Sequence, residues 1–187
     1  MKKLFEEIRA ALARGENTVL CTVLASSGSA PRGAGARMAV FADGHASGTI
    51  GGGAVERIAA EQALELLRTG ENLLRTFRLS QNQVCDIGMI CGGDVTVYYQ
   101  ILKPEELPFA DALLEMLGSG ENGWLLMKMD ANASVRMGLY DERHGLRFLD
   151  GVSMEALRPM LLAHAVYREG EESWYVEPVS RAGRVYI

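Results

Sequence analysis

Two glycine-rich segments near the N-terminus contain the residues whose types and spacing could do chemistry. They cover residues 26–38 and 49–56. Glycine lets another group approach the backbone closely, and glycine is entropically costly to order. Arg32 and Arg37 add planar guanidinium groups that suit phosphate or carboxylate oxygens. The two segments therefore predict a site for an anionic small molecule.

The second glycine-rich segment leads directly into a predicted helix. Its triplet Gly51, Gly52 and Gly53 would leave unpaired N–H groups and the positive end of a helix dipole at one spot. Phosphate or another oxyanion would be held there. The segment lacks the lysine of a P-loop and the spacing of a dinucleotide fingerprint, so ordinary nucleotide binding is not indicated. A tight strand-to-helix turn without a ligand is the alternative.

The polar residues of these segments each allow two interpretations. Glu56 would either cap the helix N-terminus or face the ligand as a base or hydrogen-bond acceptor. Arg32 and Arg37 would either bind the anion or be solvated loop residues. Ser29 would donate to the same anion or form a local turn.

The chain also contains three cysteines, which suggest a second kind of chemistry. Cys91 precedes Gly92 and Gly93, and exposed N–H groups beside it would favour the reactive thiolate. It would then bind a soft metal or carry a sulfur atom, or else it is a small buried hydrophobic residue. Cys85 and Cys91 do not have zinc-site spacing. An odd, small number of cysteines without a signal peptide predicts free thiols in the cytoplasm.

Length and charge restrict the classes of function. The chain has 187 residues, of which 48% are hydrophobic, and a net charge of −5. This length fits one large domain, or one domain with a smaller lobe, around a substantial core. The acidic balance argues against nucleic acid as a partner. No apolar run reaches the roughly 18 residues of a membrane span, so no membrane partner is expected.

The elements that must position the glycine-rich segments follow from hydrophobic periodicity. The prediction for residues 1–102 is, in order, a helix at 2–14, a strand at 18–25, strands at 37–42 and 45–50, a helix at 54–69, a strand at 72–79, an irregular segment at 80–93 and a strand at 94–102. Asp43-Gly44 favours a tight hairpin turn. Small residues and turn signals thus separate every pair of predicted elements.

Residues 103–180 are predicted to form a smaller α+β lobe. The prediction there is a connector at 103–107, a helix starting near Pro108, a three-strand meander at 124–129, 134–140 and 146–149, a short helix within 153–164 and a strand at 174–179. The expected fold class is α/β of the α+β kind. It has a mixed β-sheet with flanking helices and the smaller lobe appended.

Three blocks of sequence together resemble the XdhC/CoxI family. They are Ser27-Gly28-Ser29-Ala30-Pro31-Arg32 with Gly35 and Met38, Gly48-Thr49-Ile50-Gly51-Gly52-Gly53 with Val55-Glu56, and Gly88-Met89-Ile90-Cys91-Gly92-Gly93. Three ordered blocks are more specific than any one of them. The resemblance covers about residues 17–102, and residues 103–180 carry no recognised motif.

The resemblance implies a cofactor and partners. Members of the family are accessory proteins of molybdenum hydroxylases such as xanthine dehydrogenase. The implied function is to bind the molybdenum cofactor (molybdopterin), protect it during sulfuration and deliver it to the hydroxylase apo-enzyme. A cysteine desulfurase is a further expected partner, and the oligomeric state is left open, with a homodimer as one alternative. The implied protein is a maturation chaperone rather than an enzyme.

Family members commonly continue into a Rossmann-like domain. The first strand of that domain resembles residues 183–187, which here are the last residues of the sequence. Residues 181–187 are therefore interpreted as the start of a truncated following domain. The first predicted domain is then 1–102, and the smaller lobe is 103–180.

Taken together, the residues and the resemblance predict a cofactor site without a catalytic residue. Its members are Ser29, Arg32, Gly35, Arg37, Gly51, Gly52, Gly53, Glu56, Cys91, Gly92 and Gly93, with Cys91 as the metal contact. The family often has cysteine directly after the glycine triplet, where this chain has Ala54. Two alternatives stay open: an enzyme that uses Glu56 or Cys91 on a phosphorylated or nucleotide-like metabolite, and a scaffold that only docks the partner proteins.

Overall fold

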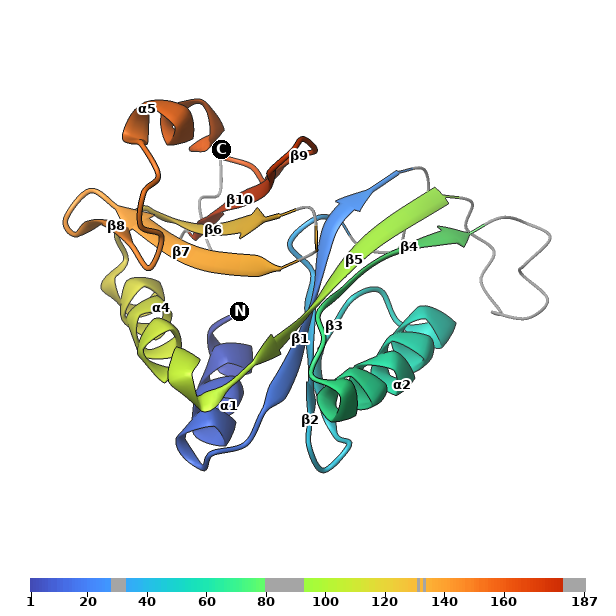
Figure 1. The fold of residues 1–187 in the computed structure, drawn as a ribbon. Helices are drawn as coiled ribbons and strands as arrows, with labels where there is room; N and C mark the ends of the chain where they lie inside the picture. The colour runs from blue at the N-terminus through green and yellow to red at the C-terminus, as the bar shows by residue number, and fades with distance from the viewer. Residues whose placement is uncertain (28–32, 80–92, 131, 133, 180–187) are drawn as a thin grey trace, which may run out of the picture. The chain divides into compact units, whose positions relative to one another are not determined.

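The computed structural model describes residues 1–27, 33–79, 93–130, 132 and 134–179. The chain divides into two compact units, the first over residues 3–107 and the second from residue 108 on. Each unit contains its own five-stranded sheet (Figure 1). The predicted irregular segment, apart from Gly93, and the predicted start of a following domain lie outside the described residues.

The first unit follows the predicted order of elements closely. Its elements are α1 (Lys2–Ala13), β1 (Thr18–Ser26), β2 (Arg37–Phe41), β3 (Ala46–Thr49), α2 (Gly53–Thr69), β4 (Leu73–Leu79), β5 (Gly93–Leu102) and the 3-10 helix η1 (Pro104–Glu106). The hairpin at Asp43-Gly44 is confirmed, and β2 pairs with β3 from Arg37↔Thr49 to Val40↔Ala46. The α+β class is confirmed as well.

Strand pairing differs from the expected mixture of parallel and antiparallel neighbours. The sheet order is β3-β2-β1-β5-β4, and each of these described pairs is antiparallel. The helix α2 follows the edge strand β3 and leads to β4 at the opposite edge. Strands β3 and β4 run in the same direction, but they never become neighbours, because β4 pairs with β5 instead. A crossover that spans the whole sheet thus leaves every pair antiparallel.

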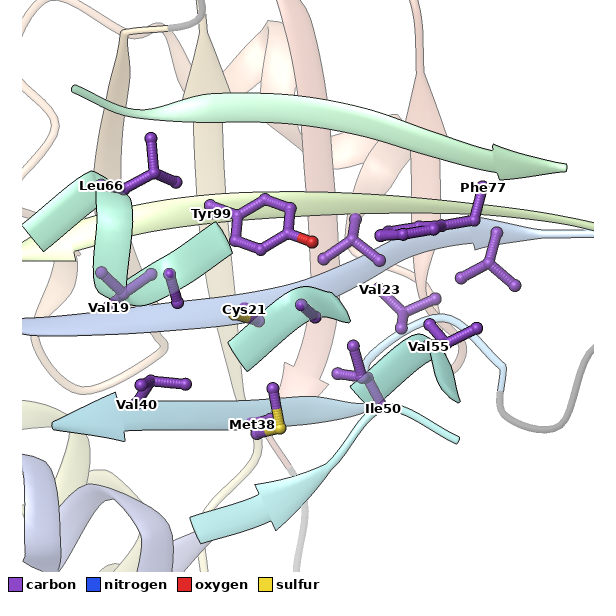
Figure 2. Packing of buried hydrophobic residues seen from close by; sticks show 14 of the residues in the cluster. Val19, Cys21, Val23, Met38, Val40, Ile50, Val55, Leu66, Phe77 and Tyr99 are labelled. Carbon is purple, nitrogen blue, oxygen red and sulfur yellow. The ribbon is translucent and has the colours of Figure 1, made fainter. Parts of the chain in front are cut away.

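Helix α2 packs its apolar stripe on one face of this sheet (Figure 2). The spacing of Val55, Ala59, Ala63 and Leu66 places all four on one side of the helix, where they are buried. They share a core cluster with alternate residues of the central strands, including Val19, Cys21, Val23, Met38, Val40, Val97 and Tyr99. Helix α1 lies on the other face of the same sheet (Figure 1). The sheet is therefore covered by a helix on each side.

The second unit is also antiparallel. Its elements are α4 (Leu107–Ser119), β6 (Gly123–Met129), β7 (Val135–Asp141), β8 (Gly145–Arg147), α5 (Met154–Leu157), the 3-10 helix η2 (Arg158–Met160), β9 (Val166–Arg168) and β10 (Ser173–Val179). The sheet order is β8-β7-β6-β10-β9, which confirms the predicted meander. Strand β9 was not predicted, because three residues are too few to show an alternating pattern.

A separate apolar cluster stabilises the second unit. It contains Leu126, Leu149, Leu157, Met160 and Val176, all buried. None of the described helices in either unit combines the length and the apolarity that a membrane span requires.

Candidate functional site

The three blocks of sequence that resemble the family (27–38, 48–56 and 88–93) are flanked by strands whose ends lie at one end of the first sheet. The strand β1 ends at Ser26, where the first block begins, and β2 starts where that block ends. The second block begins at the end of β3, and the third block ends at the start of β5. Because neighbouring strands are antiparallel, all of these strand ends lie at the same end of the sheet. Strand ends that are far apart in the sequence are thus brought together.

Hydrogen bonds attach the first block to the sheet at both of its ends. The N–H of Ser27 donates to the carbonyl of Asp94 over 2.9 Å, and the Asp94 N–H donates to Ser27 Oγ over 3.2 Å. At the other end, the Gly35 N–H donates to the Val23 carbonyl over 2.8 Å. Ser27, at the start of the first block, and Asp94, one residue after the third block, are therefore direct neighbours.

The second block forms a turn that closes around the carboxylate of Glu56. Its Oε1 accepts from the N–H groups of Ile50, Gly51 and Gly52 over 3.0, 3.2 and 2.7 Å. The Thr49 hydroxyl donates to the same oxygen, and it accepts from the Gly51 N–H over 3.2 Å. The expectation of unpaired N–H groups is wrong for Gly51 and Gly52, because the Glu56 carboxylate accepts a hydrogen bond from each.

The backbone of this turn requires glycine. Gly51, Gly52 and Gly53 have φ of 141°, 82° and 62°, a region that other residues rarely adopt. Gly48, just before the turn, has φ of 84°, and a Cβ there would lie 2.4 Å from the carbonyl oxygen of Arg37. The glycines thus serve the shape of the turn and its close approach to β2.

The environment of Glu56 favours its ionised form. Partial burial opposes ionisation, but the bonds from the Thr49 hydroxyl and from the N–H groups of Gly52, Gly51 and Ile50 outweigh it. The pKa of the Glu56 carboxyl is therefore held below its usual range. A lowered pKa and a fully engaged oxygen suit a helix cap rather than a general base.

Arg37 is a buried residue and not a solvated loop arginine. Its side chain is 6% exposed, and its Nη1 donates to the Gly35 carbonyl over 3.2 Å. This hydrogen bond joins Gly35, near the end of the first block, to Arg37, the first residue of β2. Gly35 has φ of 90°, so the block ends in a conformation that glycine allows.

Several predicted site residues lie outside the described residues. They are Ser29, Arg32, Cys91 and Gly92, whereas Gly93 is described as the first residue of β5. Within the described ranges, no group of three or more His, Cys, Asp or Glu side chains could hold a metal ion. Cys21 is buried in the core, and burial raises the pKa of its thiol far above the usual value. The assignment of Cys91 as metal contact stays a prediction.

Sequence reasoning missed three residues of this end of the sheet. Thr49 bridges the turn to Glu56, and Ser27 and Asp94 join the first block to β5. No capping-box signal existed for Thr49, because it lies seven positions before Glu56 and the N-cap of α2 is Gly52. No local signal existed for Ser27 and Asp94, which are 67 positions apart.

A hollow of about 670 Å³ lies at the opposite end of the first unit. It is lined by Gly15, Asn17, Ala42, Leu64 and Arg68, among others, and none of its lining residues belongs to a glycine-rich block. The lining also includes Glu61 and Glu65 of α2, and these two carboxylates disfavour the binding of an anion. The candidate site therefore stays with the glycine-rich blocks.

Comparison with known proteins gives relatives for the same part of the chain. Residues 11–78 match the sequence model of the XdhC and CoxI family. The molybdenum cofactor insertion chaperone PaoD of Escherichia coli is 39% identical over 94 residues, which are 50% of this chain and 29% of PaoD. The uncharacterized protein YqeB of Escherichia coli is 38% identical over 82 residues, 44% of this chain and 15% of YqeB. The matched stretch is thus less than a third of either relative.

A solved structure shares the fold. The crystal structure of a xanthine dehydrogenase from Bacillus halodurans superposes with a TM-score of 0.73 at 19% identity. The match covers 94% of this chain and 52% of that protein. The first two glycine-rich blocks lie inside the segment that matches the family. The N-terminal part of this chain is thus related to the XdhC and CoxI family, as its glycine-rich blocks predict.

Proposed function

We propose that this chain binds the molybdenum cofactor and serves as a maturation factor for a xanthine dehydrogenase-type hydroxylase. The observation that supports this most is that the strands flanking the three blocks end at one end of a sheet, with two of the blocks inside the family match. A relative that carries the name of a molybdenum cofactor insertion chaperone supports it further. The chain would protect the cofactor during sulfuration and then deliver it to the apo-enzyme.

In this proposal, different blocks of the sequence hold different parts of the cofactor. The N–H groups of Ile50, Gly51 and Gly52 are engaged by Glu56, so they do not serve its phosphate. The phosphate and pterin oxygens are assigned instead to the first block, with Ser29 and Arg32 as donors. Cys91 supplies the soft donor for the sulfur and metal end.

Purification from a molybdenum-replete host tests the proposal. The full chain is expected to carry molybdenum and pterin, and Arg32→Ala and Cys91→Ala are each expected to lower the bound amount roughly tenfold. Arg68→Ala is the matched control, because Arg68 lines the hollow at the opposite end of the unit. Absence of pterin from the unmodified chain, or equal occupancy in all variants, would contradict cofactor binding at this site.

A pull-down with the hydroxylase apo-enzyme and a cysteine desulfurase separates a chaperone from a scaffold. A chaperone that hands over its cargo is expected to capture the hydroxylase more strongly when cofactor is bound, since the loaded state is the one to be delivered. Capture that is unchanged after all cofactor is removed would favour the scaffold.

A further inference from the structure

We propose that Glu56 is a positioning residue whose carboxylate is the resident anion of the glycine turn at 51–53. It would hold this turn in the shape that cofactor binding requires, without touching the cofactor. The role of the turn in cofactor binding rests on the proposed function. The fixing of its conformation by Glu56 rests on hydrogen bonds within the chain.

The contacts converge on a single atom. Three backbone N–H groups and the Thr49 hydroxyl all donate to Glu56 Oε1. Among the described residues, none donates to the other carboxylate oxygen, Oε2. A carboxylate that accepts several N–H bonds is a strong, charge-assisted acceptor. One side chain therefore fixes four consecutive residues of the second block, from Thr49 to Gly52.

The turn needs such a hold because of its composition. Gly51, Gly52 and Gly53 all have positive φ, and glycine has more conformations to lose than any other residue. In addition, a Cβ on Gly52 would meet no described residue within 4 Å, so the space beside this Cα is open. Without the carboxylate, the turn would visit many conformations, and only a fraction would be competent to bind.

The same geometry changes the expected role of the turn toward anions. A phosphate brought to these N–H groups would have to displace a carboxylate that is covalently part of the helix. We therefore expect inorganic phosphate not to bind this turn in the unmodified chain. The protein's own anion, and not that of the ligand, binds the N–H groups of the turn that leads into the helix.

Chemical rescue of a truncated side chain tests this role. Glu56→Ala removes the anion, and Glu56→Gln removes only its charge. Glu61→Ala on the same helix is the control, because Glu61 is exposed and pairs with exposed Arg57 over 2.7 Å. The first measurement is amide hydrogen exchange at Ile50, Gly51 and Gly52 in the full chain, with and without formate. The second is affinity for molybdenum cofactor extracted from a purified hydroxylase.

In Glu56→Ala, exchange at the three amides is expected to accelerate by about tenfold, as the loss of a charge-assisted acceptor implies. Affinity for the cofactor is expected to fall by a similar factor, since both follow the fraction of ordered turn. Formate, which supplies a carboxylate of suitable size, should restore both, whereas chloride should restore neither. The exchange rate and the affinity of Glu56→Gln should lie between those of the unmodified chain and those of Glu56→Ala. Glu61→Ala should match the unmodified chain.

Two results would overturn the inference. Unchanged amide exchange in Glu56→Ala would show that the carboxylate does not hold the turn. If formate slows amide exchange in Glu56→Ala to the unmodified rate but does not restore the affinity for the cofactor, Glu56 touches the cofactor itself and is not a positioning residue. If the unmodified chain binds no cofactor, the proposed function fails, and the exchange measurement alone still decides whether Glu56 holds the turn.

Discussion

At the scale of single residues, Gly48 and Gly52 form a matched pair. Both have φ near 80°, but a Cβ at Gly48 would lie 2.4 Å from a backbone oxygen, whereas one at Gly52 would meet open space. Gly48→Ala is expected to lower the free energy of unfolding by about 3 kcal/mol, from backbone strain and overpacking together. Gly52→Ala should cost about 2 kcal/mol, from strain alone, because its φ of 82° and ψ of 177° lie in a region that is essentially restricted to glycine. Urea unfolding measures both, and equal costs would contradict the close approach at Gly48.

Glu56 gives a second prediction at this scale, on pH. Because the pKa of Glu56 is lower in the folded chain, its stabilisation is complete above the ordinary carboxyl pKa. That stabilisation is lost as the pH falls through the folded-state pKa. Glu56→Gln should therefore cost about 1 kcal/mol at neutral pH, as a lost helix cap does.

The cost of Glu56→Gln should shrink as the solution is acidified. Thermal unfolding of both chains across an acid pH series measures this difference. A difference that stays constant with pH would show that the charge of Glu56 does not stabilise the fold. Glu61→Ala serves as the control here too, since Glu61 is exposed on the same helix.

At the scale of elements, two hairpins use the same turn chemistry in different surroundings. In the turn between β7 and β8, Asp141 accepts from the His144 N–H and Nδ1 and from Arg147 Nη2, at 2.7, 3.0 and 3.0 Å. Asp43 accepts from the His45 N–H and Nδ1 in the turn between β2 and β3. Asp141 is 3% exposed, whereas the Asp43 side chain is 71% exposed. We therefore expect the buried Asp141 to contribute more to the stability of its turn than the exposed Asp43 does.

Asp141→Ala is therefore expected to destabilise the second unit by about 2 kcal/mol. The substitution removes the acceptor of a partly buried arginine, and a buried charge that loses its partner is costly. Burial alone would raise the pKa of Asp141, but the bonds from His144 and the charge of Arg147 lower it, so the loss should be largest above acid pH. Thermal unfolding checks this, with Asp43→Ala as a control that should change stability much less.

At the scale of the whole molecule, each unit has a core cluster of its own. Leu126→Ala in the second cluster should cost about 3 kcal/mol, as for other buried leucines. Because Leu126 belongs to the second unit, faster hydrogen exchange is expected in β6, β7 and β10 and not in β1, β2 and β5. Val97→Ala in the first cluster should show the reverse pattern. Equal acceleration in both sheets would mean that the chain unfolds as one unit.

The sequence by itself determined the elements and most of their ends. Periodic apolar residues predicted α1 and α2, Asp43-Gly44 predicted the hairpin, and Gly70 predicted the end of α2, where its N–H donates to the Leu66 carbonyl over 2.8 Å. These features are local, since each depends on residues within a few turns of the chain. The three glycine-rich blocks also indicated a family, which the match over residues 11–78 confirms for the first two blocks.

Only the tertiary structure decided which strand ends meet at one end of the sheet and which anion binds the glycine turn. Strand neighbours are chosen by long-range packing, so neither the antiparallel pairing of β4 with β5 nor the contact of Ser27 with Asp94 could be predicted. The two interpretations of Glu56, cap or ligand contact, differ by the position of one carboxylate. The structure places that carboxylate on the N–H groups of Ile50, Gly51 and Gly52. Side-chain position is set by the folded backbone, and that is why the sequence left both interpretations open.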